Sequence, residues 1–288
     1  MNKPRMFVSF SGGRTSAYMA QWIKRTMGDT HELLFVFANT GQEHEETLKF
    51  VRRCDEAFGL GVVWVEADVQ FGARVSTKHR IVTFETASRN GLPFEHVIQK
   101  YGIPNQKFPH CTRELKLNPM YSYVDSVWPE RDYQIAVGLR VDEQRRRRKD
   151  AEFARIVYPL MDWHQIDKED VNAWWEQQPF NLNLSERQGN CVWCWKKSDR
   201  KHLLNLADDP ESYEFPDRME KLYPDAGAGN GGRVFFRGNR STQDLIALSQ
   251  IVIPDERMGA RDDEDGGCSE SCEAFGEQQL DLFDEVAA

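Results

Sequence analysis

The alternation of apolar and polar positions divides much of the chain into short strands and amphipathic helices. Apolar runs rich in β-branched and aromatic residues predict strands, and apolar positions three and four residues apart predict helices. The predicted strands span residues 6–10, 33–38, 61–65, 134–137 and 156–158, and the predicted helices span residues 16–25, 45–58, 168–176 and 196–206. This order predicts an α/β fold with a doubly wound, mostly parallel sheet that binds ligands at the carboxyl ends of its strands.

The pattern changes twice along the chain, which predicts three regions. Residues 1–165 carry the strand–helix alternation of a nucleotide-binding domain, and residues 166–253 are predicted to form a helical part that contributes to a substrate site. From Pro254 onward acidic residues outnumber basic ones and periodicity is lost until the last residues. We therefore predict that residues 254–288 form a disordered tail.

Composition narrows the class of protein. The chain has 288 residues, of which 40% are hydrophobic and 29% charged, and no apolar run approaches the roughly 20 residues that span a bilayer. The N-terminus lacks the features of a signal peptide, and six cysteines do not make a disulfide scaffold at this length. These features predict a cytoplasmic protein with reduced thiols and no membrane partner. The net charge of −9 argues against indiscriminate binding of nucleic acid.

A glycine-containing loop lies between the first predicted strand and the first predicted helix. Backbone N–H groups and the helix dipole favour an anion at such a position, and glycines let a pyrophosphate approach the backbone. An ordinary capped glycine turn is the alternative, and the GxxxxGK[ST] spacing of a Walker loop is absent. The candidate phosphate-binding residues are Ser9, Ser11, Gly12, Gly13, Arg14, Thr15 and Ser16.

This loop resembles the SGGxxS signature of the PP-loop family, which contains ATP pyrophosphatases and phosphoadenosine phosphosulfate (PAPS) reductases. Four further segments are similar to family motifs in the same order, namely residues 37–41, 110–119, 138–143 and 158–163. The resemblance covers residues 6 to about 200. It implies the adenine nucleotide alpha-hydrolase-like version of the α/β fold and the binding of an adenine nucleotide, ATP or PAPS.

The resemblance also implies roles for individual residues. Asn39 would lie near the adenosine, and Gly138 and Arg140 would face the polyphosphate or sulfate. The candidate catalytic residues are Arg140, Asp142 and Lys116. Arg14-Thr15 stands where many pyrophosphatases carry Lys-Asp, which leaves the handling of the terminal phosphate and the use of magnesium open.

Three cysteines have a spacing that suits a metal site. Cys191 and Cys194 form a CxxC, and Cys111 precedes this pair by 80 residues. The resemblance implies a 4Fe–4S cluster, because some sulfonucleotide reductases hold one with a cysteine pair and a CxxC at similar spacing. His110 replaces the first cysteine of that pair, so either it is a fourth ligand or one iron stays open to a sulfur substrate, and we favour the open iron. Zinc, or inert or redox-active thiols, are the alternatives.

Two arginine-rich segments and a terminal peptide are candidates for contacts with large partners. Residues 145–149 and 233–241 suit contacts with nucleic-acid phosphates, the alternatives being a solvated loop and a strand with a turn that closes the core. The terminal peptide resembles the QL[SD]LF sequence with which bacterial proteins bind the DNA sliding clamp, and an apolar patch folded back on the protein is its alternative. It consists of Gln279, Leu280, Asp281, Leu282 and Phe283.

These features together favour an ATP-dependent enzyme of sulfur transfer, similar to the PP-loop subunit of DNA phosphorothioation systems. In this hypothesis the acceptor, preferably nucleic acid, is adenylated with release of pyrophosphate, and sulfide at the cluster displaces AMP. A cysteine desulfurase or another donor would supply the sulfur. The first alternative is a sulfonucleotide reductase, whose nucleophile motif is missing around Cys268 and Cys272. The second is a non-catalytic nucleotide-binding adaptor recruited to the sliding clamp.

Overall fold

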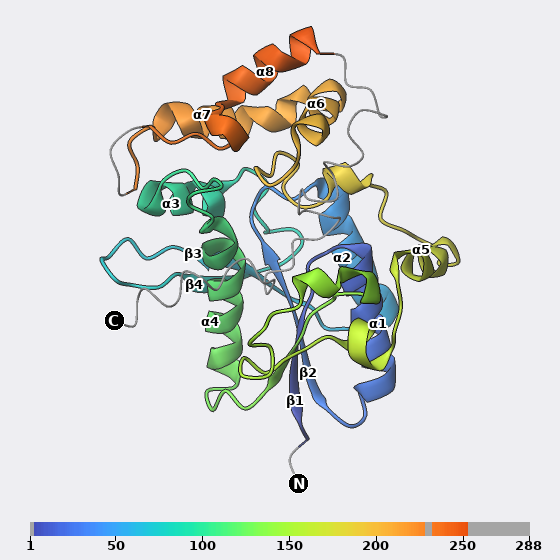
Figure 1. Ribbon diagram of the computed structural model, residues 1–288. Coiled ribbons are helices and arrows are strands. Elements are labelled where there is room, and N and C mark those ends of the chain that lie inside the picture. Colours follow the sequence, from blue (N-terminus) through green and yellow to red (C-terminus); the bar gives the residue numbers. More distant parts are fainter. Residues whose placement is uncertain (1–2, 228–231, 253–288) are drawn as a thin grey trace.

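The computed structural model describes residues 3–227 and 232–252, in which a six-stranded sheet has helices on both faces (Figure 1). The strand order is β4-β3-β2-β1-β5-β6; β4 pairs with β3 in antiparallel orientation, and all other pairs are parallel. The predicted α/β class with a mostly parallel sheet is therefore confirmed. The strands are β1 Arg5–Ser9, β2 Glu32–Asn39, β3 Val63–Asp68, β4 Lys78–Val82, β5 Gln134–Ala136 and β6 Ile156–Val157.

The chain adds strands to one side of β1 first and to its other side afterwards. The chain passes from β1 to β2 and β3 on one side, and returns later to β5 and β6 on the other side. Neighbouring crossovers therefore diverge between β1 and β5, which makes the carboxyl ends of these two strands the switch point of the sheet. Sheets of this type bind their ligands at that position.

Helices form two layers against the sheet and a further group beyond its carboxyl edge (Figure 1). α1, α2 and α5 share one apolar cluster with residues of the sheet, α4 belongs to a second, and α3 and α6–α8 pack in a third. The helical region after residue 165 is thus divided between the first and the third cluster. The helices are α1 Arg14–Met27, α2 Glu45–Phe58, α3 Leu92–Tyr101, α4 Asn118–Val127, α5 Lys168–Glu176, α6 Asp199–Asp208, α7 Glu214–Leu222 and α8 Thr242–Ile251.

Several element boundaries differ from the sequence-based prediction for local reasons. The third strand begins at Val63, two residues after Gly61 with its φ of +71°, and continues to Asp68 because β4 pairs with it. α6 begins at Asp199 because Ser198 caps it by accepting a hydrogen bond from the N–H of Lys201. β4 itself was not predicted, since it is an edge strand with mostly exposed side chains and no apolar alternation.

None of the described helices is long and apolar enough to cross a membrane. The predicted disordered tail, residues 254–288, lies outside the described residues.

Candidate active site

The candidate phosphate loop follows β1 and leads directly into α1. Gly12 has a φ of +84°, and a Cβ atom on it would lie 2.8 Å from Thr47 Cγ2 on α2. Glycine is therefore required at this position both by the backbone and by the packing of α2. Gly13 caps α1 with a φ of −93°, so of the two glycines Gly12 alone has a positive φ.

The start of α1 suits an anion. Gly13 contributes no side-chain cap, and the first turn carries no acidic residue. The first N–H groups of a helix have no partner within the helix, and they lie at the positive end of its dipole. The hydroxyls brace the loop instead: Ser11 Oγ donates to Ser16 Oγ at 2.9 Å, and Ser16 Oγ donates to the Gly13 carbonyl at 3.0 Å. Main-chain N–H groups are thus the natural donors to a phosphate.

The loop that follows β5 lies directly against the start of α1. A Cβ atom on Gly138 would lie 3.1 Å from Ser16 Cα, so the two backbones are in close contact. The buried Arg140 donates from Nη1 to Thr15 Oγ1 at 2.8 Å, across 125 residues of sequence. The structure therefore brings Gly138 and Arg140 to the candidate phosphate loop.

Asp142 fixes the Arg140 guanidinium in this place. Nε and Nη2 of Arg140 donate to the two carboxylate oxygens of Asp142, each at 3.0 Å. Burial raises the pKa of Asp142, but the hydrogen bonds and the charge of Arg140 outweigh this effect and hold the pKa below its usual value. Asp142 is ionised at neutral pH and touches the site through Arg140.

The side chain of Arg14 is directed toward the segment after α5. Its Nε donates to Asn181 Oδ1 at 2.8 Å, and its Nη2 also contacts the carbonyl oxygen of Leu182. This fork fastens the beginning of α1 to residues 181–184.

A buried carboxylate organises the end of β2. Asn39 Nδ2 donates to Glu66 Oε1 at 2.7 Å and to the Ser88 carbonyl at 2.9 Å. Glu66 on β3 is fully buried and also accepts from the N–H of Ser88 and from Arg80 Nη2, both at 2.5 Å. The Asn39 amide is occupied by these contacts, so a nucleobase would meet main-chain atoms here. Sequence reasoning missed Glu66, whose signal is a carboxylate between the apolar residues Val65 and Ala67 of β3.

The three candidate metal-binding cysteines lie in one apolar cluster. Cys191 is buried in the third cluster, and Cys111 and Cys194 are half-buried against it. The CxxC forms a turn in which the N–H of Cys194 donates to the Cys191 carbonyl at 2.9 Å. Within residues 3–227 and 232–252, no three His, Cys, Asp or Glu side chains are arranged to hold a metal ion. The thiols share a neighbourhood but do not form a ligand set as they lie.

A chain of polar groups joins Cys191 to the end of β2. Thr40 Oγ1 lies 3.6 Å from Cys191 Sγ and donates to Glu43 Oε1 at 3.1 Å. The same Glu43 oxygen lies 3.5 Å from Lys116 Nζ, and Glu43 forms an antiparallel bridge with Cys191. Burial, together with the charge of Glu43, raises the pKa of Cys191 to about 12. The candidate catalytic Lys116 thus lies near Cys191, between the nucleotide half of the site and the cysteines.

His110 is buried beside the cysteine cluster. Its Nε2 lies 3.1 Å from the Gly102 carbonyl oxygen, which can only accept, so Nε2 carries the proton and Nδ1 the lone pair. Burial lowers the pKa of His110 to about 4, which makes the ring neutral at physiological pH. The imidazole is therefore in the form that binds metals, although it belongs to no ligand set among the described residues.

Packed tryptophan side chains exclude water, and four of them occur in α5 and beside the CxxC. Trp193 and Trp195 are buried in the third cluster, where Trp193 packs on Phe94 at a centroid distance of 5.1 Å. Trp174 and Trp175 belong to the first cluster. Only Trp193 and Trp195 are therefore placed to exclude water near the cysteines.

The arginine run at residues 145–149 is largely neutralised by neighbouring carboxylates. Arg147 donates to both oxygens of Asp162, at 2.7 and 3.1 Å. Arg148 pairs in the same way with Asp150, and Arg146 with Glu143. These pairs reduce the positive charge that the run can offer to a phosphate.

In the segment at residues 233–241 the aromatic side chains support the alternative of a turn that closes the core, whereas Arg233 lies over the exposed Phe108 ring. Phe235 and Phe236 are buried in the third cluster rather than available for stacking on bases. Phe236 and Arg240 form an antiparallel bridge, and Arg240 pairs with Asp199. The segment is a turn that closes the core.

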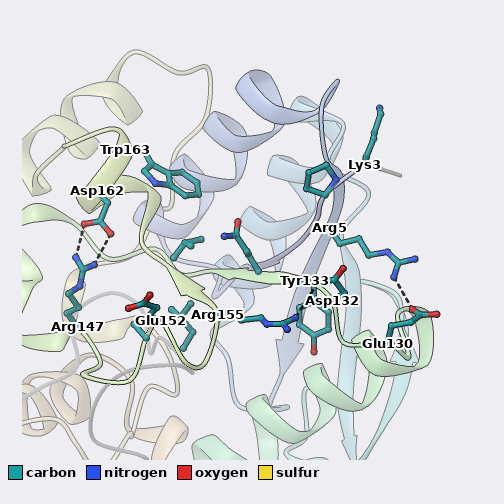
Figure 2. A pocket seen from close by; sticks show the side chains of 15 residues that line it. Lys3, Arg5, Glu130, Asp132, Tyr133, Arg147, Glu152, Arg155, Asp162 and Trp163 are labelled. Carbon is teal, nitrogen blue, oxygen red and sulfur yellow. Dashed lines mark hydrogen bonds and ion pairs between the residues drawn. The ribbon is translucent and has the colours of Figure 1, made fainter. Parts of the chain in front are cut away.

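A pocket of about 1070 Å³ lies away from the phosphate loop, at the amino ends of β1, β5 and β6 (Figure 2). Its charged lining pairs internally: Arg5 with Glu130, Arg147 with Asp162, and Arg155 with Asp132. This charge-balanced pocket includes Arg147 of the predicted arginine run, but none of the predicted nucleotide-binding or metal-binding residues.

The remaining predicted residues are in the tail. Cys268, Cys272 and the clamp-like peptide at residues 279–283 lie outside the described residues.

Comparison with known proteins gives one relative along nearly the whole chain. The nin region protein ORF290 of Escherichia phage lambda is 30% identical over 292 residues, which cover 94% of this chain and 95% of the phage protein. The proteins MJ0066 and MJ0973 of Methanocaldococcus jannaschii are 24% and 23% identical over 174 and 166 residues. These alignments cover 58% and 55% of this chain but only 30% and 33% of the archaeal proteins. No family model matches the chain.

Proposed function

The chain belongs to the family of the nin region protein ORF290 of Escherichia phage lambda, and we propose that it is a PP-loop enzyme that binds ATP and adenylates an acceptor in sulfur transfer. One observation carries the proposal: the start of α1, which has no side-chain cap, lies between Gly12 and the buried Arg140, at the switch point between β1 and β5. Main-chain donors, a helix dipole and a fixed guanidinium meet there, as a polyphosphate requires.

The charge distribution of the site matches the demand of adenylyl transfer. Negative charge accumulates on the α-phosphate and on the departing pyrophosphate during the reaction. A cation that is already held in place stabilises this charge without reorganisation. Arg140 meets that condition because Thr15 and Asp142 fix its orientation.

The reaction consists of two displacements. An oxygen of the acceptor attacks the α-phosphorus of ATP, the new P–O bond forms, and the bond to pyrophosphate breaks with its electron pair on the pyrophosphate. A sulfur nucleophile from a donor such as a cysteine desulfurase then attacks the acceptor atom that bears the adenylated oxygen. The new bond to sulfur forms, and the bond to that oxygen breaks with its electron pair as AMP leaves with the oxygen. The chain contributes binding and orientation of ATP and acceptor, with nucleic acid as the favoured acceptor.

Cys111, Cys191 and Cys194 would hold the 4Fe–4S cluster, with His110 as a further candidate ligand and zinc as the alternative metal. The chemistry that a cluster would supply is a site for sulfur delivery. Because these side chains do not form a ligand set as they lie, no step is assigned to a metal. Burial and the charge of Glu43 raise the pKa of Cys191, and the neighbouring Lys116 and Lys197 offset this only in part, so the free thiol is protonated and would release its proton on binding a metal.

Anaerobic calorimetric titration with magnesium ATP and, in parallel, with PAPS tests the nucleotide. We expect ATP to bind and PAPS to bind at least tenfold more weakly. Arg140→Ala should abolish ATP binding, whereas Arg147→Ala, which breaks an equally well-formed ion pair elsewhere, should leave it unchanged. Selective binding of PAPS would overturn the proposal in favour of a sulfonucleotide reductase, and ATP binding without pyrophosphate release on any nucleic acid would favour the adaptor.

Metal content tests the cysteines separately. Protein purified without oxygen should contain about four irons per chain, the content of the predicted cluster. Cys191→Ala should lose the iron, and Cys54→Ala, which removes a buried cysteine of α2 outside the proposed set, should keep it. Stoichiometric zinc in place of iron would contradict the cluster and leave the ATP site untouched.

The C-terminal tail gives a prediction that can be tested independently of the ATP site. If residues 279–283 bind the DNA sliding clamp, deleting them should abolish capture by the clamp without changing the affinity for ATP. Clamp capture that survives the deletion would show that the peptide is not the binding element.

A further inference from the structure

Several stretches of this acidic chain contain no carboxylate, and two of them meet in the fold. Of 288 residues, 46 are Asp or Glu and the net charge is −9, yet residues 69–84 and residues 96–113 carry only basic charges. The first segment is the loop between β3 and β4 with the edge strand β4, and the second runs from α3 to Arg113. Both segments therefore offer positive charge alone, and both are distant in sequence from the arginine run at residues 145–149.

The fold brings these two segments together. Lys100 at the end of α3 donates to the carbonyl oxygens of Gln70 and Val75, at 2.5 and 2.7 Å. The ring of Phe71 packs edge-on against His96, with centroids 5.9 Å apart. Figure 1 shows the loop between β3 and β4 projecting beside α3. The two acid-free segments thus form one continuous surface.

The surface also presents aromatic rings to solvent. Phe71 is 59% exposed and Phe108 is 39% exposed, which is unusual for rings of this size. The guanidinium of Arg233 lies over the Phe108 ring at 3.7 Å from its centroid, and Arg233 donates to the Tyr101 carbonyl at 2.9 Å. Phe108 is held in place by this contact and is only three residues from Cys111.

Three cations of the surface are available to a ligand. Arg74, Lys78 and Lys107 are exposed and form no ion pair with any carboxylate in residues 3–227 and 232–252. This distinguishes them from Arg146, Arg147 and Arg148, which have carboxylate partners. We call Phe71, Arg74, Lys78, Lys107, Phe108 and Arg233 the arm surface.

We propose that the arm surface binds a single strand of nucleic acid and leads it to the cysteine cluster. Exposed rings accept unpaired bases by stacking, and exposed cations contact the backbone phosphates, a combination that suits single strands and not duplexes. The proximity of Phe108 to Cys111 places the strand next to the cysteines. The inference deepens the proposed function and rests on it, since it names nucleic acid as the acceptor of that site.

Fluorescence anisotropy with full-length protein and a labelled oligothymidylate of about 15 nucleotides tests the surface, because strands of this length occupy such sites. Arg74→Glu with Lys107→Glu should raise the Kd at least tenfold at about 0.1 M salt and lower the slope of log K against log salt by about two. Phe71→Ala should raise the Kd between about fivefold and a hundredfold through the loss of one stacked base, without changing the slope.

Matched variants control for charge and for exposed rings. Lys24→Glu changes an exposed cation near the end of α1, and Phe153→Ala removes a ring that is 92% exposed outside the arm surface. Both should bind the oligonucleotide like the wild type. The same oligonucleotide in duplex form should bind more weakly, and an RNA strand of the same length decides whether ribose is preferred.

The outcomes separate this inference from the proposed function. Unchanged binding in the double variant, or equal binding of single strand and duplex, would overturn the arm surface while ATP binding and pyrophosphate release stand. Oligonucleotide binding by a protein that fails to bind ATP would keep the arm surface and overturn the adenylation chemistry.

Discussion

The amino ends and the carboxyl ends of the parallel strands, here called the amino edge and the carboxyl edge of the sheet, differ in ways that the volume of a pocket does not reveal. The amino edge carries a pocket of about 1070 Å³ whose arginines pair with carboxylates of the same pocket (Figure 2). The carboxyl edge has an uncapped helix start, glycine-dependent backbone contacts and a guanidinium clamped above them. Both edges hold arginines that pair with carboxylates, and what distinguishes the carboxyl edge is the helix start with its dipole and the close backbone contacts around it, which favour a bound anion.

The two edges also differ in how closely their residues are packed. At the carboxyl edge, Gly12 and Gly138 allow backbone and side chains to meet at distances that no larger residue permits. At the amino edge, the ion pairs join exposed side chains, which contribute little to stability. The carboxyl edge should therefore be far more sensitive to substitution, and the following predictions test this difference.

The largest effect is expected for Gly12→Ala. A left-handed φ of +84° and a Cβ position 2.8 Å from Thr47 Cγ2 combine backbone strain with overpacking, so the free energy of unfolding should fall by about 3 kcal/mol. Urea denaturation measures this loss, and calorimetry should show at least a tenfold weaker affinity for ATP.

Gly59→Ala is the matched control for Gly12→Ala. Gly59 also has a left-handed φ, +60°, but no atom lies within 4 Å of the position that a Cβ atom would take there, so only the backbone strain of about 1 kcal/mol should appear. Equal losses in the two variants would show that the close approach of α2 to the loop has no energetic weight.

A smaller effect is expected for Arg140→Ala. Removal of the guanidinium leaves Thr15 and the carboxylates of Asp142 and Glu143 without their donor, which should lower the free energy of unfolding by about 2 kcal/mol. Arg147→Ala removes an exposed bidentate pair and should cost less than about 1 kcal/mol. If both variants unfold at the same urea concentration, the two edges do not differ in the way proposed.

The sheet was predictable because its central strands are apolar and its helices amphipathic. α2 and α5 have the predicted bounds, and four of the five predicted strands lie within about two residues of their observed position. β4 was missed because an edge strand with exposed side chains lacks an apolar pattern. α3 and α4 were missed as well, and each begins with a proline in its first turn that obscures the helical pattern.

The sequence predicts the candidate site only where the residues of the site are contiguous in the chain. The phosphate loop is a contiguous motif, so its position between β1 and α1 follows from the pattern of residues. The contact of Arg140 with Thr15 and the link from Thr40 through Glu43 to Lys116 depend on how distant strands end at one edge. Glu66 was overlooked because its importance comes from its partners Asn39, Ser88 and Arg80, which no spacing in the sequence connects.

The smallest expected effect concerns the pH dependence of the ion pair between Arg140 and Asp142. The pKa of Asp142 is lowered in the folded protein, so its carboxylate stabilises the fold above the unfolded pKa of about 3.9, and this stabilisation is lost as the pH falls through the lower folded value. Asp142→Asn should therefore be less stable than the wild type at pH 6, and the difference should shrink at pH 3. Because the Asp142 side chain is 40% exposed, solvent screens the pair and the difference stays small. Urea midpoints of both proteins at the two pH values measure it, and a difference that grows on acidification would mean that Asp142 is not held ionised by Arg140.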